Sequence, residues 1–276
     1  MYGVTIIEVP VRFPLQDHAT IVDGVRRALH NATLRGLNVR VAVISHIASI
    51  PAFVLPVSEL IEICRNHGAL SLVDGAHAIG QIPINVSSLA PDFYLSNIHK
   101  WMYGPKGTAF LYVRPSSQLP RFPEPTVISS SGKPDFLGRY AYVGTRDYSA
   151  YASIPAAFDF REELGDRNVY AYCRGLALWA SDHLAYKWGT RVLVPNSMQA
   201  FMVNVELPTN STSDATALQV ALDKTHSMYI VVAEIDGIIY TRLSSQVYLE
   251  KSDFERLGAL VLDILQTKSS SSVFIS

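Results

Sequence analysis

The sequence from residue 39 to residue 77 is VRVAVISHIASIPAFVLPVSELIEICRNHGALSLVDGAH. Two short apolar runs rich in β-branched side chains, at residues 39–44 and 69–73, predict strands. Between them, residues 57–67 have apolar side chains at helical spacing, and Gly68 follows where a helix would close. Continuous apolar strands that alternate with helices predict a mostly parallel sheet with helices on both faces, so the expected fold class is α/β.

The alternation of strand and helix continues on both sides of this stretch. Residues 4–9, 91–96 and 109–113 predict strands, residues 17–31 and 150–188 predict helices, and residues 115–140 predict a long loop rich in Pro, Ser and Gly. Shorter elements follow, with strands expected at 192–194, 202–207, 228–232 and 238–243 and helices at 215–225 and 253–265. We therefore expect a large domain at residues 1–164 and a smaller C-terminal α/β domain at residues 165–276.

The composition of the chain excludes several classes of protein. Its 276 residues include 23 basic and 24 acidic ones with no basic run, so no nucleic-acid partner is expected. The start lacks a signal-peptide pattern, and the longest apolar stretch is shorter than the roughly 20 residues that cross a bilayer, so no membrane association is expected. Cys64 and Cys173 form no disulfide framework, which favours a cytoplasmic location. His46, His77 and His99 lack the spacing of a zinc motif, so no metal is expected.

Polar residues collect where the predicted parallel strands end, which is where such sheets bind ligands. They are Ser45, His46, Ser49, Asp74 and His77. Asp74 directly follows a strand and precedes two small residues, so its carboxylate could meet a flat ligand and keep a pyridinium nitrogen protonated. Taken alone, Asp74 could equally cap a loop or a helix.

Lys100 is the candidate nucleophile. It lies between His99 and Trp101 in an apolar neighbourhood, which disfavours the ammonium form and leaves a neutral amine that can attack an aldehyde. A surface lysine with a buried stem is the alternative interpretation. A lysine that forms a Schiff base and an aspartate at a ring nitrogen are the pair that pyridoxal phosphate (PLP) chemistry needs.

Several segments together resemble a known family of PLP enzymes. DGAH at 74–77, HKW at 99–101 and GTRD at 144–147 occur in this order, flanked by SHIASIPAFVLPV at 45–57 and RLSSQVY at 242–248. This series is similar to the class V aminotransferase superfamily of fold type I, over residues 35–265. Within it, the chain looks most like the isopenicillin N epimerase-like branch, which includes cysteine desulfhydrase-like and C–S lyase-like proteins. The resemblance implies a partial PLP-dependent transferase large domain.

The resemblance also implies roles for residues of the large domain. Lys100 would hold PLP as a Schiff base and later move the α-proton of an amino-acid substrate. Asp74 would pair with the pyridine nitrogen, and His77 and Ser49 would lie near the phenolic edge of the ring.

Further positions match residues that contact the phosphate or the substrate. Asn97 and His99 would face the phosphate, and Thr145 would reach the phosphate of a neighbouring subunit, which implies a homodimer. Arg242 would bind the substrate carboxylate through a bidentate pair. Arg146 and Asp147 would brace their loop by an ion pair.

The sequence departs from the family at its start. Residues 1–34 predict one strand and one helix, whereas the family pattern expects a longer region there that includes the helix N-terminus for the phosphate. The chain is therefore expected to be N-terminally truncated relative to the family, with an exposed sheet edge and apolar face.

Three functions remain open at this stage. The first is PLP-dependent C–S lyase or desulfhydrase-type elimination from an amino acid. The second is epimerisation or transamination by the same fold, because all these reactions share a carbanion at Cα. The third is a non-catalytic remnant that no longer binds PLP.

Overall fold

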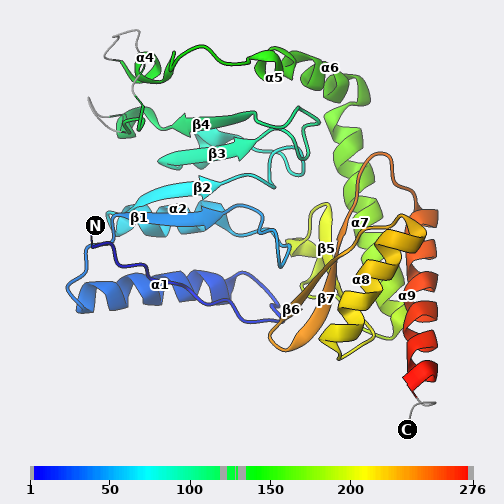
Figure 1. Ribbon diagram of the computed structural model, residues 1–276. Helices are drawn as coiled ribbons and strands as arrows, with labels where there is room; N and C mark the ends of the chain where they lie inside the picture. Colours follow the sequence, from blue (N-terminus) through cyan, green and yellow to red (C-terminus); the bar gives the residue numbers. More distant parts are fainter. Residues whose placement is uncertain (1–2, 119–122, 128, 130–134, 273–276) are drawn as a thin grey trace. The chain divides into compact units, whose positions relative to one another are not determined.

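The computed structural model describes residues 3–118, 123–127, 129 and 135–272, with side chains to residue 267 (Figure 1). The chain divides into two compact units. The first unit contains Met1–Ala28, Ile47–Pro56 and Gly165–Ser276, and the second contains Leu29–His46 and Val57–Leu164. The C-terminal part of the first unit thus begins at Gly165, and two earlier segments of the chain belong to the same unit. As a statement about domains, the division into residues 1–164 and 165–276 stays a prediction.

The second unit is built on a four-stranded sheet. Its strands are β1 (Val41–Ser45), β2 (Leu70–Asp74), β3 (Phe93–Asn97) and β4 (Ala109–Val113), in that spatial order. The first three run parallel, and β4 pairs with β3 in the antiparallel direction. The predicted mostly parallel α/β sheet is therefore confirmed. Each of the four strands begins within two residues of its predicted start.

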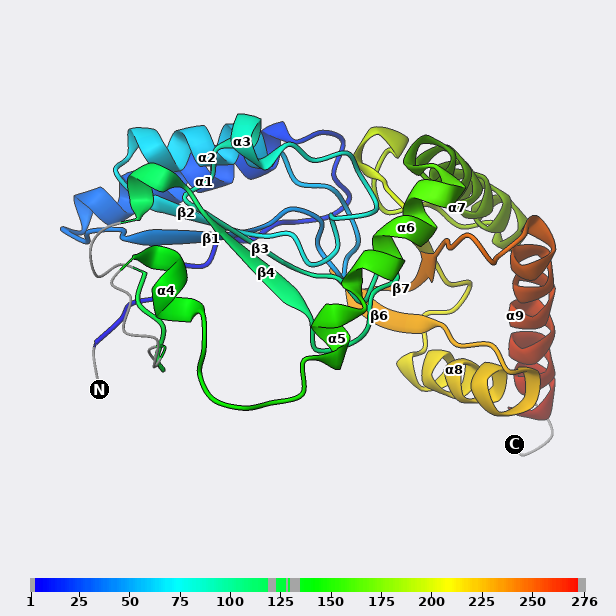
Figure 2. The same cartoon turned by 90° about the horizontal axis from the view of Figure 1, so that it is seen from above.

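Helices α2 (Val57–Asn66) and α3 (Val86–Leu89) lie on the same face of this sheet (Figure 2). The face below them is closely packed, since Val73 and Tyr94 have no exposed surface. On the opposite face, Val43 is 73% exposed and Leu111 is 42% exposed. The sequence predicted helices on both faces; in the described part of this unit, α2 and α3 cover one face and apolar side chains are exposed on the other.

The N-terminal segment differs from its prediction. Residues 4–9 are extended but belong to no strand, and Val4 is 80% exposed and Ile6 82% exposed. The pattern predicted a strand there, yet a strand requires a neighbour to accept and donate its backbone hydrogen bonds. The first regular element is instead α1 (Ala19–Leu34), and the Asp17 carboxylate accepts a hydrogen bond from Ala19 N, at the start of this helix, at 2.9 Å.

The region after β4 is more helical than predicted. It contains the short 3-10 helix η1 (Pro115–Ser117) and the helices α4 (Phe136–Tyr140), α5 (Ser149–Ala152) and α6 (Ile154–Leu164). Gly165, which has a φ of +77°, interrupts the helical pattern predicted over residues 150–188. That backbone conformation suits glycine and ends the helical path before α7 begins. The middle of the predicted loop lies partly outside the described residues.

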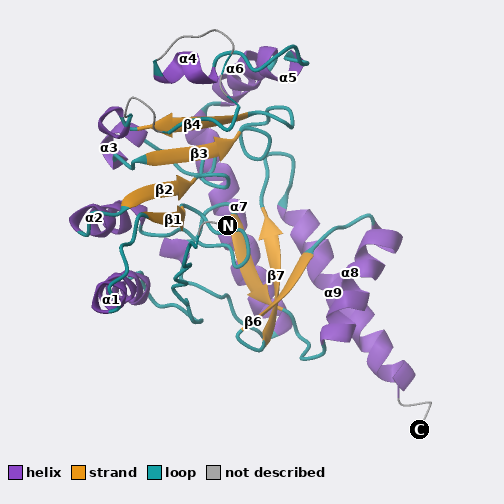
Figure 3. Cartoon of the chain, turned by 60° about the vertical axis from the view of Figure 1, so that its left-hand side comes forward, coloured by secondary structure: helices purple, strands orange, loops and turns teal. Residues whose placement is uncertain are grey.

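The first unit contains a small antiparallel sheet covered by three helices. The strands β5 (Met202–Glu206), β7 (Ile238–Ser244) and β6 (Val231–Ile235) lie in that order. Their apolar side chains pack with those of α7, α8 and α9, so the helices cover one face of the sheet (Figure 3). The helices span Asp166–Trp188, Thr212–His226 and Lys251–Ser272. The strand predicted at 192–194 is reduced to one bridge between Val192 and Val205, and the short 3-10 helix η2 (Asn196–Met198) follows it.

Segment Ile47–Pro56, which follows β1 in the chain, packs within the first unit. The Asn204 side chain on β5 accepts a hydrogen bond from Ala52 N at 2.6 Å, and Val54 N donates to Met198 O at 2.8 Å. Asn204 is 2% exposed, so this bond forms in a buried place. The segment that carries Ser49 is thereby fixed against β5.

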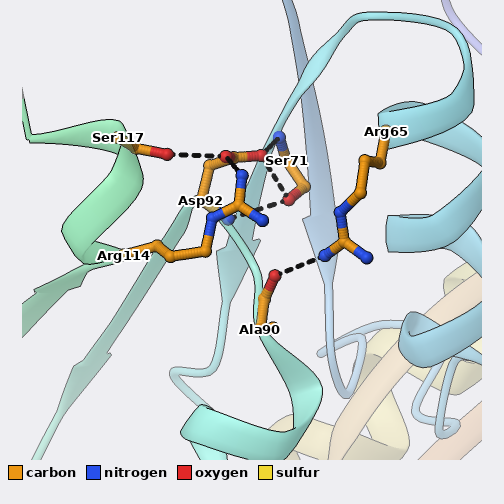
Figure 4. Close-up of polar contacts among 6 residues, drawn as sticks. All are labelled: Arg65, Ser71, Ala90, Asp92, Arg114 and Ser117. Carbon is orange, nitrogen blue, oxygen red and sulfur yellow. Dashed lines mark hydrogen bonds and ion pairs between the residues drawn. The ribbon is translucent and has the colours of Figure 1, made fainter.

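A buried polar cluster around Asp92 joins the strands of the second unit at the edge opposite to the two turns of Asp74 and Lys100 (Figure 4). Asp92, which is 4% exposed, accepts hydrogen bonds from Ser71 N and Ser71 Oγ at 2.9 and 3.0 Å. It also accepts from Ser117 Oγ at 2.7 Å and forms an ion pair with Arg114. The cluster joins β2, the start of β3 and the region after β4, so it stabilises the sheet that carries the candidate site.

No helix among the described residues has both the length and the apolar character that a membrane span requires.

Candidate active site

Two turns at the carboxyl edge of the second unit's sheet carry the residues proposed for chemistry. The first turn follows β2 and contains Asp74 and His77, and the second follows β3 and contains Lys100. Because β2 and β3 are neighbouring parallel strands, their ends lie at the same edge of the sheet. The fold therefore brings together residues that are 23 to 26 positions apart in the sequence.

His77 is the centre of the contacts between these turns. Its Nε2 lies 3.4 Å from Lys100 Nζ, and its Nδ1 accepts a hydrogen bond from Trp101 Nε1 at 3.2 Å. Its backbone carbonyl accepts from the Gln81 side chain at 2.6 Å. The imidazole is thus held from two sides, with one nitrogen directed to the lysine amine. The pairing of His77 with Lys100 was not predicted, since the resemblance placed His77 beside the ring only.

Asp74 forms the start of the first turn. Its carboxylate accepts a hydrogen bond from Ala76 N at 2.9 Å, which is an Asx-type turn. The next residue, Gly75, donates its N–H to Leu95 O at 2.7 Å and accepts from Ser96 Oγ at 2.8 Å. These bonds to β3 fix the direction in which the carboxylate leaves the sheet.

A buried pair of side chains, His46 and Tyr94, adjoins the turn that begins at Asp74. His46 and Tyr94 are joined by a hydrogen bond of 2.9 Å between Nδ1 and the phenol oxygen, and His46 N donates to Asp74 O at 2.8 Å. Burial lowers the pKa of His46 to about 4. Burial, followed by the charge of Asp74, raises the pKa of Tyr94 above its usual value. Both side chains are therefore neutral near pH 7. Tyr94 was not a predicted site residue, because a tyrosine within an apolar strand gives no separate signal.

Replacing Gly75 by alanine is expected to destabilise the fold by about 1–3 kcal/mol through overpacking. A Cβ at position 75 would overlap the Tyr94 ring and its phenol oxygen, so the ring must move. Gly175→Ala is the matched control, because a Cβ there meets nothing within 4 Å and alanine favours the interior of α7. Urea unfolding measures both. Equal midpoints for Gly75→Ala and the unchanged chain would contradict close packing of Gly75 against Tyr94.

The remaining predicted residues of the second unit differ in their surroundings. Asn97 is the last residue of β3, and its Oδ1 is buried without a hydrogen-bond partner among the described residues. His99 is exposed. Thr145 is exposed as well, and its hydroxyl is 3.0 Å from the Tyr142 phenol oxygen. The phosphate-binding roles of these three residues stay predictions.

Ser49 and Arg242 are brought together in the first unit. Arg242 Nη1 donates to Ser49 Oγ at 2.9 Å and to Ser49 O at 3.1 Å. Burial lowers the pKa of Arg242 from its usual value, and its Nε is buried with no hydrogen-bond partner among the described residues. A half-buried guanidinium with a donor to spare can bind an anion such as a carboxylate. The resemblance proposed both residues, but their contact was not predicted.

With this geometry in place, comparison with known proteins assigns the family. The model of the class V aminotransferases matches residues 22–229, and the chain belongs to this family of PLP-dependent lyases and transferases. The predicted family is therefore confirmed.

Three individual relatives illustrate what the chain is similar to. The chain is 33% identical to a putative L-cysteine desulfhydrase 1 of Oryza sativa subsp. japonica, over 98% of this chain and 61% of the relative. It is 30% identical to hercynylcysteine sulfoxide lyase of Schizosaccharomyces pombe, over 79% and 57% of the two chains. It is 32% identical to isopenicillin N epimerase of Streptomyces clavuligerus, over 81% and 60%. The chain thus spans about three fifths of the length of these relatives.

A solved structure supports the fold. A cysteine desulfurase from Thermococcus onnurineus NA1 superposes with a TM-score of 0.68 at 19% identity, over 89% of this chain and 63% of that one. The predicted fold, a partial PLP-dependent transferase of fold type I, is confirmed at this level.

Proposed function

We propose that this chain binds PLP at Lys100 and catalyses elimination of a sulfur group from Cβ of an amino acid. The observation that carries the proposal is the 3.4 Å contact between Lys100 Nζ and His77 Nε2, at the edge of the sheet where Asp74 also lies. These residues fit the cofactor by their chemistry: an amine for the aldehyde, a carboxylate for the pyridine nitrogen and an imidazole in contact with the amine. The buried Oδ1 of Asn97 offers a further acceptor at the same edge.

Each residue has a defined task in this proposal. PLP, when bound, supplies an electron sink for the carbanion at Cα of the substrate. The Asp74 carboxylate, fixed by Ala76 N, holds the proton on the pyridine nitrogen. The Lys100 amine takes the α-proton, and His77 orients that amine. In the first unit, Arg242 binds the substrate carboxylate, and its hydrogen bonds to Ser49 set the direction of the guanidinium.

The two cysteines support elimination over desulfuration through a persulfide. Cys64 and Cys173 are both fully buried. Burial, together with the charge of Asp92, raises the pKa of the Cys64 thiol, so it is a poor nucleophile. Elimination needs no protein thiol, because the α-proton and the sulfur group leave the substrate itself. Two of the relatives described above are also named for the release of sulfur from cysteine or a cysteine sulfoxide.

Product analysis tests the reaction. The PLP-treated chain is incubated with L-cysteine and with S-substituted cysteine sulfoxides, and the products are assayed. Elimination predicts a 2-oxo acid and ammonia in equal amounts, with sulfide from cysteine. Inversion at Cα without sulfide would overturn elimination in favour of the epimerase, to which the chain is also similar. Transfer of the amino group to an added 2-oxo acid would overturn it in favour of an aminotransferase.

Arg242→Lys is expected to raise KM about tenfold to a hundredfold with a smaller change in kcat. Lysine keeps the charge but loses the bidentate geometry, and hydrogen bonds to charged groups are worth about 1.5–3 kcal/mol. Arg191→Lys is the matched control, since Arg191 is exposed and paired with Glu206. Steady-state kinetics compare the two. An Arg242→Lys variant with the KM of the control would remove Arg242 from carboxylate binding.

The share of its relatives' length that the chain covers supports a second candidate, a protein without PLP chemistry. Because the chain spans about three fifths of its relatives, a remnant that keeps the fold without binding PLP is the alternative. Absence of covalently attached PLP in the folded chain would select it.

We also propose a homodimer. Its support is a run of exposed aromatic and apolar side chains around Thr145, namely Tyr142, Val143, Tyr148 and Tyr151. Sedimentation equilibrium tests this, and a monomer at micromolar concentration would contradict it.

A further inference from the structure

The hydrogen bond from Trp101 to His77 constrains the protons of the imidazole. An indole nitrogen is a donor only, so His77 Nδ1 must be an acceptor in the 3.2 Å contact with Trp101 Nε1. An imidazolium has N–H donors at both nitrogens and cannot accept there. His77 is therefore neutral, and its single proton is on Nε2.

The proton on Nε2 has a consequence for Lys100. Nε2 lies 3.4 Å from Lys100 Nζ, so a proton on Nε2 faces the amine. An ammonium offers three donors and no lone pair, whereas a neutral amine offers a lone pair that can accept. We propose that Trp101 is a positioning residue: its indole N–H selects the His77 tautomer that presents a donor to Lys100 and thereby favours the neutral, nucleophilic amine.

Buried contacts fix Trp101 in this place. Trp101 is 5% exposed, and its carbonyl accepts a hydrogen bond from Arg161 Nη1 at 3.2 Å. The same Nη1 donates to Gly80 O at 3.2 Å. Arg161 is 2% exposed and comes from α6, so one buried guanidinium joins the turn that carries His77 to the turn that carries Lys100. The indole is thus held by its backbone as well as by its ring.

Other charged and titratable groups lie on the segments that adjoin Lys100. They are Asp74 and His77 on the first turn, His99 and Tyr103 on the second, and Arg161 on α6. By its charge, a carboxylate near an amine favours the ammonium and a guanidinium disfavours it. The proposed effect of Trp101 on the protonation of Lys100 passes through the imidazole of His77. Replacement of His77 therefore distinguishes it from the effects of these other groups. The role of the neutral amine rests on the proposed function, but the tautomer can be tested without cofactor or substrate.

The tautomer is tested directly on the cofactor-free chain. Long-range ¹H–¹⁵N spectra of the chain with ¹⁵N-labelled histidine distinguish the two neutral tautomers and the imidazolium for each of the eight histidines. The signals that disappear in His77→Gln assign His77. The expected result near pH 7.5 is a single Nε2–H tautomer. An Nδ1–H tautomer or an imidazolium would overturn the proposal, and this result needs no variant of Trp101.

The effect on Lys100 is tested by amine labelling. Trp101→Phe keeps most of the ring but removes the N–H, so His77 can adopt the Nδ1–H tautomer, in which Nε2 accepts a hydrogen bond from the ammonium form of Lys100. Labelling of Lys100, followed by mass spectrometry, should slow about tenfold near pH 7.5, which corresponds to a shift of one pH unit in its protonation. Trp188→Phe is the matched control: Trp188 is also buried, and its Nε1 donates to Gly258 O at 3.1 Å in the first unit. It should leave Lys100 labelling unchanged.

A double-variant cycle shows whether Trp101 acts through His77. In the His77→Gln background, Trp101→Phe should change Lys100 labelling less than twofold. A tenfold slowing in that background would overturn the proposal, since packing alone would then explain it. The confirmed tautomer in a chain that never attaches PLP would contradict the proposed function and leave this inference intact.

Discussion

Lys100→Arg is expected to abolish covalent attachment of PLP while the chain remains folded. Arginine has a similar length and keeps a positive charge, but its guanidinium stays protonated and cannot attack an aldehyde. Lys100 is in a turn and only partly buried, so its replacement should change the melting temperature little. The measurement is the mass of the intact chain after incubation with PLP and reduction with borohydride.

Lys106→Arg is the matched control, because Lys106 lies six residues further on and is exposed. It should keep the full mass increment. An increment in Lys100→Arg as large as that of the control would show that PLP attaches elsewhere and would remove Lys100 from its role.

Asp92→Asn is expected to cost about 3 kcal/mol of the free energy of unfolding. The change removes the charge that pairs with Arg114 and replaces one oxygen that accepts hydrogen bonds by a donor group. Breaking a buried ion pair typically costs about 3–5 kcal/mol, and the lower end applies because Arg114 keeps some contact with water. Urea unfolding near pH 7 measures the loss. Asp159→Asn, an exposed position on α6, is the control and should change the midpoint little.

The same residue predicts how stability depends on pH. Burial acts to raise the pKa of Asp92, but hydrogen bonds from Ser71 and Ser117 and the charge of Arg114 outweigh it, so the pKa lies below its usual value of 3.8. The folded state therefore binds this proton less tightly than the unfolded state. The stabilisation is present above the unfolded-state value and is lost as the pH falls through the folded-state pKa. In Asp92→Asn, the free energy of unfolding should fall less steeply as the pH is lowered. An equally steep fall in the variant would show that other groups cause the acid sensitivity.

The sheet of the second unit could be predicted because its information is local. Apolar runs that end in polar residues indicate buried strands, and the end of β2 at Asp74 follows from that pattern. Residues 4–9 have the same local pattern but no partner strand among the described residues, so the prediction failed there. The interruption at Gly165 was missed because the helical pattern continues on both sides of it.

The candidate site was predicted residue by residue but not as a set of contacts. Lys100, Asp74 and His77 follow from motifs and from the resemblance, whereas the contact between Lys100 and His77 depends on how two turns meet. The bond between Arg242 and Ser49 joins residues 193 positions apart and could not be inferred from spacing.

Supporting residues give weaker signals still. Asp92 is one acidic residue next to an apolar strand, and Arg161 is one arginine on a helix. Neither has a motif, because their function depends on burial, which becomes visible only once the strands and turns are assembled.

The most direct test of the proposed function is to locate PLP on the unaltered chain. The chain is incubated with PLP at a modest excess, reduced with borohydride, digested and analysed by mass spectrometry for phosphopyridoxyl-lysine. We expect one modified residue, Lys100, at close to full occupancy. Folded chain with no modification, or with low modification spread over exposed lysines such as Lys187, Lys224 and Lys251, would contradict it.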